Sequence, residues 1–219
     1  HRWDRILDID NYNMVFTILN QDGDLIHTPE EITANDVWGS SCYSDVNMPC
    51  FYDPRITATG DNHFSFAFYQ RITETGDITY EDIILGIRSS TGGSILPLTN
   101  FTRGVTDADF YYSPSITSLA GNKTLLTWNS GELYYVVLDS YGNIINPITS
   151  SGFYLENVDA IQVQGGNIIV AGDDWGNEIR YFVLESTGFT ITTPITTISN
   201  SVSPSDNRYV SITKDTLGH

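Results

Sequence analysis

Basic residues are scarce in this chain. Lys and Arg together number 10, against 27 Asp and Glu, which gives a formal net charge of −17 at pH 7 over 219 residues. An electrostatic field of that sign repels phosphate backbones and anionic lipid headgroups. We therefore expect no nucleic-acid partner and no insertion into a membrane, which leaves other protein copies or surface glycans as partners.

Long apolar runs and common catalytic motifs are also missing. No stretch reaches the roughly 18 apolar residues of a membrane-spanning helix, and no charged-then-apolar leader opens the chain. There is no Gly-x-Ser-x-Gly elbow, no Gly-rich phosphate loop and few histidines. We therefore do not expect a serine or cysteine nucleophile or nucleotide chemistry. Because the chain starts at His1, we expect a mature or excised piece of a longer precursor.

Cysteine is limited to Cys42 and Cys50. Both lie in the segment 37–53, which has the polar and proline content of a loop, and no nearby histidine would complete a zinc site. We predict a disulfide between them in an oxidising compartment, which would make the protein extracellular or attached to the cell surface. Two reduced thiols in a cytosolic protein are the alternative.

What the chain does contain is an internal repeat. An apolar strand end, a turn with Gly, a second apolar run and then Pro occur four times. The prolines of the four copies are Pro29, Pro97, Pro147 and Pro194. A second phrase, seen in Pro54-Arg55-Ile56-Thr57 and Pro114-Ser115-Ile116-Thr117, opens a strand about every 45 to 60 residues. That period is typical of a four-stranded propeller blade.

Turn residues divide each repeat into short strands. Gly, Asn and Asp accept the positive φ of tight hairpins, and long helical periodicity is absent. We predict an all-β fold, a single β-propeller domain over 1–219 with about four blades of four antiparallel strands. The C-terminal strand would complete the first blade and remove exposed sheet edges. The predicted limits are repeats near 1–37, 54–105, 114–156 and 159–203, an insert loop at 37–53 and a closing strand at 208–219.

A resemblance follows from these phrases. A strand, a Gly-Asn turn, a strand ending in Trp and then Leu-Asp-Ser-x-Gly-Asn, as in 121–143, resembles the blade repeats of large secreted or surface-anchored prokaryotic propeller proteins. The resemblance covers nearly the whole chain. The repeated signatures of the WD40 and sialidase-type propellers are missing. The resemblance implies a propeller fold, an extracellular or cell-surface location and a scaffolding role, and it carries no catalytic residues.

Aromatic residues gather beside the insert loop and at the matching position one repeat later. The candidate binding residues are Trp38, Tyr43, Phe51, Tyr52, Tyr111 and Tyr112. Aromatic faces stack on sugars and anchor protein interfaces. Because Phe51-Tyr52 precedes Pro54 and Tyr111-Tyr112 precedes Pro114, packing between blades is the favoured interpretation.

Acidic segments raise the question of calcium and of acid–base chemistry. The segments 8–13 and 20–24 carry several oxygen ligands, and 173–178 is denser still, but none fits an EF-hand loop and turn chemistry competes in each. We expect no cofactor, with calcium as the weaker alternative, and assign no metal ligands. Paired carboxylates also support glycoside hydrolysis, although 27 acidic residues produce some pairs by chance.

The composition and the repeat together favour a noncatalytic extracellular module for adhesion, surface or filament assembly, or ligand display, and not an enzyme. Two alternatives stay open. A glycan-binding lectin would need exposed aromatic residues in 37–53. A glycoside hydrolase-like enzyme using paired carboxylates would need acidic residues that converge on one face with a raised pKa.

Overall fold

The computed structural model describes residues 14–33, 49–73, 79–102, 111–174, 178–187, 189–200 and 210–213, and within them it contains strands and turns but no helix. Accordingly, the described residues include no helix that could cross a membrane. The first sheet pairs β1 (Val15–Leu19) with β2 (Leu25–Glu31). Three four-stranded antiparallel sheets follow it along the chain.

Each four-stranded sheet is a simple meander, so that neighbours in the sequence are neighbours in the sheet. The second sheet contains β3 (Pro49–Thr59), β4 (His63–Thr73), β5 (Thr79–Ser89) and β6 (Ser94–Asn100). The third contains β7 (Tyr112–Leu119), β8 (Lys123–Asn129), β9 (Leu133–Asp139) and β10 (Ile144–Ser150). The fourth contains β11 (Glu156–Gln162), β12 (Ile168–Asp173), β13 (Glu178–Leu184) and β14 (Ile191–Asn200).

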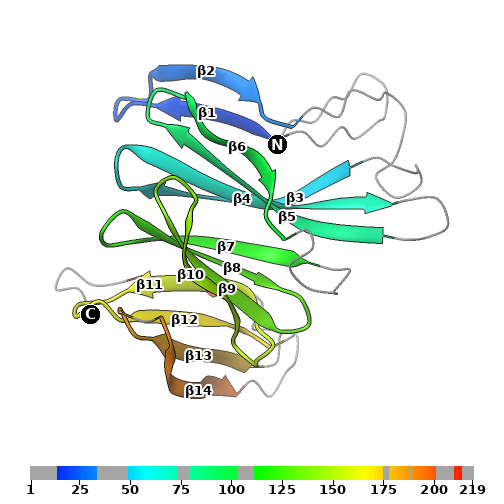
Figure 1. Ribbon diagram of the computed structural model, residues 1–219, viewed down its shortest axis with the longest axis vertical. Coiled ribbons are helices and arrows are strands. Elements are labelled where there is room, and N and C mark those ends of the chain that lie inside the picture. The colour runs from blue at the N-terminus through cyan, green and yellow to red at the C-terminus, as the bar shows by residue number, and fades with distance from the viewer. Residues whose placement is uncertain are drawn as a thin grey trace.

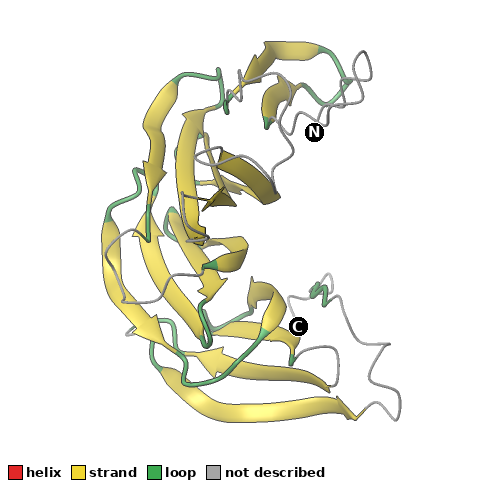
Figure 2. Ribbon diagram, turned by 90° about the vertical axis from the view of Figure 1, so that its right-hand side faces the viewer, coloured by secondary structure: helices red, strands yellow, loops and turns green. Residues whose placement is uncertain are grey.

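The sheets succeed one another along an arc (Figures 1 and 2). The first strands of the three large sheets are the inner ones, because β7 contacts both β3 and β11. The fourth strands, β6, β10 and β14, lie at the outer edge and carry Pro97, Pro147 and Pro194, which lack the N–H that an edge needs to recruit another strand. The predicted all-β propeller of four-stranded antiparallel blades is confirmed.

The C-terminal segment 210–213 lies beside the inner strands. The backbone N–H of Ile212 donates a hydrogen bond of 2.8 Å to Oδ2 of Asp159 on β11. Val210 and Ser211 line the same pocket as residues of β3, β7 and β11, but the described residues 210–213 form no strand. The rest of the predicted closing strand 208–219 lies outside the described residues, and the predicted repeat limits stay a prediction.

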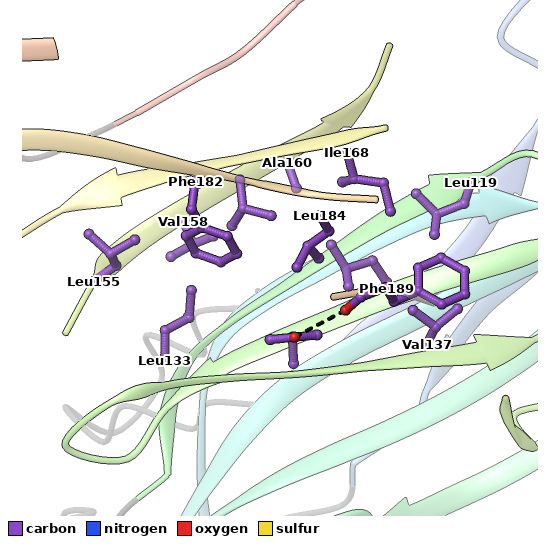
Figure 3. Packing of buried hydrophobic residues seen from close by; sticks show 13 residues of the cluster. Leu119, Leu133, Val137, Leu155, Val158, Ala160, Ile168, Phe182, Leu184 and Phe189 are labelled. Atoms are coloured by element: carbon purple, nitrogen blue, oxygen red, sulfur yellow. Dashed lines mark hydrogen bonds between the residues drawn. The ribbon is translucent and has the colours of Figure 1, made fainter. Parts of the chain in front are cut away.

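The core consists of apolar side chains packed between successive sheets. Leu133 and Val137 of β9 face Phe182 of β13 and Leu155 before β11, and all four are fully buried (Figure 3). The hydroxyl of Tyr135 crosses the same interface and donates a hydrogen bond of 3.1 Å to the carbonyl oxygen of Phe189 (Figure 3). Apolar packing plus this bond fixes the third blade against the fourth.

The hairpin turns explain why two copies of the repeat place Asn or Asp three residues before the Gly. Asp139 Oδ1 accepts hydrogen bonds from the backbone N–H groups of Tyr141 and Asn143, while Asn143 Nδ2 donates to Asp139 Oδ2. Gly142 supplies a φ of 88° in this turn. The β1–β2 turn has the same geometry with acid and amide exchanged, since Asn20 accepts there and Asp24 is its partner.

Candidate functional site: acidic residues at the ends of the inner strands

A bulge interrupts each of the three inner strands at the same register. Pairing with the second strand shifts between Tyr52 and Arg55, between Tyr112 and Ser115, and between Glu156 and Asp159. The residue inside each bulge has a positive φ, namely 49° at Asp53, 50° at Ser113 and 46° at Asn157. Asp and Asn tolerate this conformation, whereas Ser113 holds it only where the surrounding structure enforces it. The repeated bulge therefore marks one end of the propeller, where three blades place equivalent side chains.

The residue before each bulge faces a partner on the second strand of its blade. In the second sheet these are Tyr52 and Tyr69, whose rings stack with centroids 4.9 Å apart. The third sheet has Tyr112 opposite Asn129. In the fourth sheet the same position holds two acids, Glu156 on β11 and Asp173 on β12. Directly opposed residues have Cβ atoms about 4.5–5.5 Å apart, so this blade carries a pair of neighbouring carboxyl groups.

Each acid of this pair has its own hydrogen-bond donor. Asn157 Nδ2 donates to Asp173 Oδ2 at 2.8 Å, and Asp173 is only 1% exposed. The Tyr154 hydroxyl donates to Oε1 of Glu156, and it lies 3.2 Å from the hydroxyl of Tyr112. Glu156 is partly exposed. Glu156 is therefore the acid that a ligand can reach, and Asp173 is a buried support behind it.

A third acid, Glu81, approaches from the neighbouring blade. The backbone N–H of Tyr111 donates to the Glu81 carbonyl oxygen at 3.1 Å, which joins the beginning of β7 to that of β5. Burial raises the pKa of the Glu81 carboxyl, and the Arg71 guanidinium, 3.7 Å away, offsets only part of that rise. Glu81 therefore keeps its proton to a higher pH than an exposed glutamate does.

The Tyr112 hydroxyl connects the two accessible acids. Burial raises the pKa of Tyr112 most, the hydrogen bond with Tyr154 lowers it, and the negative charges of Glu156 and Glu81 raise it further. The charges of both carboxyl groups thus act on one hydroxyl, although the two acids come from different blades. A glutamate with a raised pKa, in the same region as a second glutamate that accepts a hydrogen bond, is an arrangement suited to general acid–base chemistry.

A pocket of about 360 Å³ lies along the inner strands. Its walls include Arg55 from β3, Ile116 from β7, Asn157 and Asp159 from β11, and Val210 and Ser211. Asn157 belongs both to this pocket and to the acid pair, because its side chain donates to Asp173. The pocket and the acids are therefore adjacent parts of one region.

The structure describes four of the six aromatic residues predicted to bind a ligand. Phe51 and Tyr111 are buried in the core, at 9% and 3% exposure. Tyr52 and Tyr112 are half-buried and stand at the bulged ends described above. Trp38 and Tyr43 lie outside the described residues, so a binding role for this set stays a prediction.

The structure describes only some of the residues in the cysteine and metal predictions. Cys50 is fully buried on β3, whereas Cys42 lies outside the described residues, so the disulfide stays a prediction. The segment 8–13 also lies outside them, and 20–24 forms the β1–β2 turn. In the described part of the chain, no group of three or more His, Cys, Asp or Glu could hold a metal ion.

Sequence reasoning missed Glu81, Tyr154, Glu156 and Asp173. A signal for Glu156 was present, because Glu156-Asn157-Val158 occupies the place of Tyr52-Asp53-Pro54 in the repeat. Asp173 stands at the start of the acid-dense segment that was interpreted as a turn. Glu81 had no comparable signal, since its importance depends on burial between two blades.

The comparisons with known proteins concern the fold. No protein-family model matches the chain, and no curated protein matches it in sequence. It is similar to the solved endo-arabinase of Bacteroides thetaiotaomicron, with a TM-score of 0.47 and 12% identity over 94% of this chain and 86% of that one. An α-L-arabinofuranosidase from Podospora anserina gives a TM-score of 0.47 and 8% identity, over 78% of this chain and 55% of that one.

A Bacteroides caccae protein of unknown function gives a TM-score of 0.47 and 12% identity, over 87% of this chain and 55% of that one. The chain thus spans about half the length of the B. caccae and P. anserina structures. At TM-scores below 0.5 these likenesses say nothing about which side chains act, so any chemistry must be argued from the acids themselves.

The prediction of a noncatalytic module for adhesion, assembly or ligand display is wrong, and so is the expectation that the chain is not an enzyme. Glycoside hydrolases recur among the solved structures of similar fold, including a family-43 glycoside hydrolase beside the two enzymes above. The alternative with paired carboxylates is the better supported one. The repeat consists mainly of turn and packing positions, which predict architecture and not chemistry. The acids Glu156 and Asp173 occur in one blade only, so the sequence alone does not distinguish them from a chance pair.

Proposed function

We propose that this chain is a glycoside hydrolase-like enzyme in which Glu81 donates a proton and Glu156 acts as the partner carboxylate. The observation that carries the proposal is that the charges of these two acids, from different blades, both act on the Tyr112 hydroxyl, with the pKa of Glu81 raised by burial. Glycoside hydrolysis needs one carboxyl group that is protonated and one that is not.

The reaction follows from these two states. Glu81 gives its proton to the glycosidic oxygen as the bond from that oxygen to the anomeric carbon breaks, and positive charge develops on the sugar ring. The Glu156 carboxylate stabilises that charge and either attacks the anomeric carbon or takes a proton from the water that does. Overall one water molecule is added across the bond. The configuration of the released sugar distinguishes the two routes.

The remaining polar residues act on Glu156 and not on the sugar. The hydrogen bond from Tyr154 fixes the orientation of the Glu156 carboxylate. Asp173 is held by Asn157 and is buried, so we assign it a positioning role behind the reacting pair. A rigid second layer of this kind is what keeps a reacting carboxylate within the narrow geometry that catalysis requires.

The test is hydrolysis of a panel of 4-nitrophenyl glycosides, beginning with α-L-arabinofuranoside and including galactoside, xyloside and glucuronide. We expect the wild type to cleave at least one member, and Glu156→Gln and Glu81→Gln to lower kcat/KM by about 10²- to 10⁴-fold. Glu185→Gln is the matched control, because Glu185 lies beyond β13 at the opposite end of its blade and should leave the rate unchanged. No cleavage of any glycoside, or full activity in Glu156→Gln, would refute the proposal.

A further inference from the structure

Arg55 differs from every other described arginine because it forms no ion pair with an acid in the described part of the chain. The other three form ion pairs, Arg71 with Glu81, Arg88 with Glu30, and Arg180 with Asp174 and Glu178. The described lysine, Lys123, lies over the ring of Phe189 at 5.4 Å. The chain has a net charge of −17, so most arginines should have an acidic partner. An arginine without an ion pair to any described carboxylate is therefore unexpected. Arg55 also lines the pocket of about 360 Å³ along the inner strands, so it is accessible to a ligand that enters this pocket.

The acid that shares the pocket, Asp159, is already engaged by backbone groups. Its Oδ2 accepts the N–H of Ile212 at 2.8 Å, and its Oδ1 accepts the N–H of Ala160 at 2.9 Å. Both oxygens therefore have donors without any contribution from Arg55. The guanidinium retains its capacity for a planar, two-bond contact with an incoming carboxylate.

The remaining walls of the pocket suit a sugar ring. Ser115, Ser211 and the Asn157 amide offer hydroxyl and amide groups for hydrogen bonds to sugar hydroxyls. Ile116 and Val158 provide apolar contact for the C–H faces of a ring. A volume of about 360 Å³ lies near the lower end of the range for small-molecule sites, roughly 300–1,000 Å³.

From these observations we infer that the pocket along the inner strands binds a uronic-acid residue, with Arg55 as the group that recognises its carboxylate. The inference rests on the proposed function in one respect, since Asn157 connects the pocket to the acid pair and so makes the bound uronate part of a glycan substrate. The negative field of the protein repels anions in general, so one accessible guanidinium would favour anions only within the pocket.

The test measures binding separately from hydrolysis. Glucuronate is titrated into the full chain by calorimetry, beside its uncharged methyl ester, glucose and acetate. We expect glucuronate to bind and the other three to bind at least 10-fold more weakly, since the ester and glucose lack the charge and acetate lacks the ring. Loss of a charge-assisted, two-bond contact predicts about 10- to 100-fold weaker binding of glucuronate by Arg55→Gln. The affinity of Arg55→Lys for glucuronate should lie between those of the wild type and Arg55→Gln, because lysine keeps the positive charge but lacks the planar pair of N–H donors.

Lys123→Gln is the matched control, because it removes one positive charge at the β7–β8 turn, away from the pocket, and should bind glucuronate like the wild type. Equal binding of glucuronate and its ester, equal binding of acetate, or unchanged affinity in Arg55→Gln would overturn the inference. Hydrolysis of a neutral glycoside without glucuronate binding would refute the assignment of the pocket and leave the proposed function supported. Glucuronate binding by a chain that cleaves no glycoside would refute the proposed function and support the pocket assignment.

Discussion

Glu156 on β11 and Asp173 on β12 are direct cross-strand neighbours, at the register where the second blade holds the stacked rings of Tyr52 and Tyr69. Like charges in directly opposed positions ordinarily destabilise a sheet. Here each acid has a separate donor, Tyr154 for Glu156 and Asn157 for Asp173. Asn157 lies in the bulge with a φ of 46°, and its amide donates to Asp173. The blade thus keeps an arrangement that is poor for stability and useful for chemistry.

Replacing Asn157 by Asp should destabilise the protein. The new side chain accepts the same backbone conformation, but it removes the amide that donates to the buried Asp173 carboxyl and adds an acid beside it. We expect a loss of about 2 kcal/mol, which corresponds to a fall in Tm of about 4–8 °C. Thermal unfolding at pH 7 measures it.

Asn62→Asp supplies the control for this change. Asn62 has a φ of 58° in the exposed β3–β4 turn, so the same chemical substitution there meets no buried acid. The Tm of Asn62→Asp should stay within about 2 °C of the wild type. Equal losses in the two variants would mean that the bond between Asn157 and Asp173 has no special role.

Tyr154→Phe should lower activity without unfolding the protein. The substitution removes the hydroxyl that orients Glu156 and keeps the ring, so kcat should fall by about 10-fold with little change in KM. Steady-state kinetics on the best glycoside of the panel measures both constants. Tyr141→Phe is the matched control, since Tyr141 is 56% exposed in the β9–β10 turn, and its kinetics should equal those of the wild type. An effect confined to KM would contradict the positioning role.

The sequence was sufficient for the architecture because blade structure depends on local signals. Gly, Asn and Asp at the turns and prolines at the outer edge recur in each repeat, and the structure places them in those roles. The site depends instead on which blades meet. Glu81 and Glu156 are far apart in the chain and act on one hydroxyl only because β5 and β7 adjoin at their beginnings. No single-sequence pattern contains that contact or the burial that raises the pKa of Glu81.

Glu81→Gln should stabilise the protein at neutral pH and have no effect in acid. The pKa of Glu81 is raised in the folded state, so its ionisation costs stability as the pH rises from the unfolded value near 4.5 through the higher folded value. Glutamine does not ionise and avoids that cost. The Tm of the variant relative to wild type should therefore increase between pH 4 and pH 7.

The control is Glu185→Gln, which removes a negative charge from a turn at the other end of the propeller. Its Tm difference from the wild type should change less over the same pH interval. A Glu81→Gln variant whose relative Tm falls between pH 4 and pH 7 would show that pairing with Arg71 outweighs burial, and that Glu81 is ionised too early to serve as a proton donor.

Asp139 provides the opposite case, a carboxylate that the fold stabilises. Burial alone would raise its pKa, but hydrogen bonds from the Asn143 side chain and from the backbone N–H groups of Asn143, Tyr141 and Gly142 hold the pKa below its ordinary value of 3.8. This stability is fully present above pH 3.8 and is lost as the pH falls through the lower folded value. Asp139→Ala should therefore lower the free energy of unfolding by about 1 kcal/mol at pH 7 and by less at pH 2.5.

Urea unfolding at the two pH values measures the difference, and Asp22→Ala, in the exposed β1–β2 turn, should lower the free energy of unfolding little at either pH. A cost for Asp139→Ala that is the same at both pH values would mean that the turn is held by its shape and by Gly142, and not by the charge of Asp139.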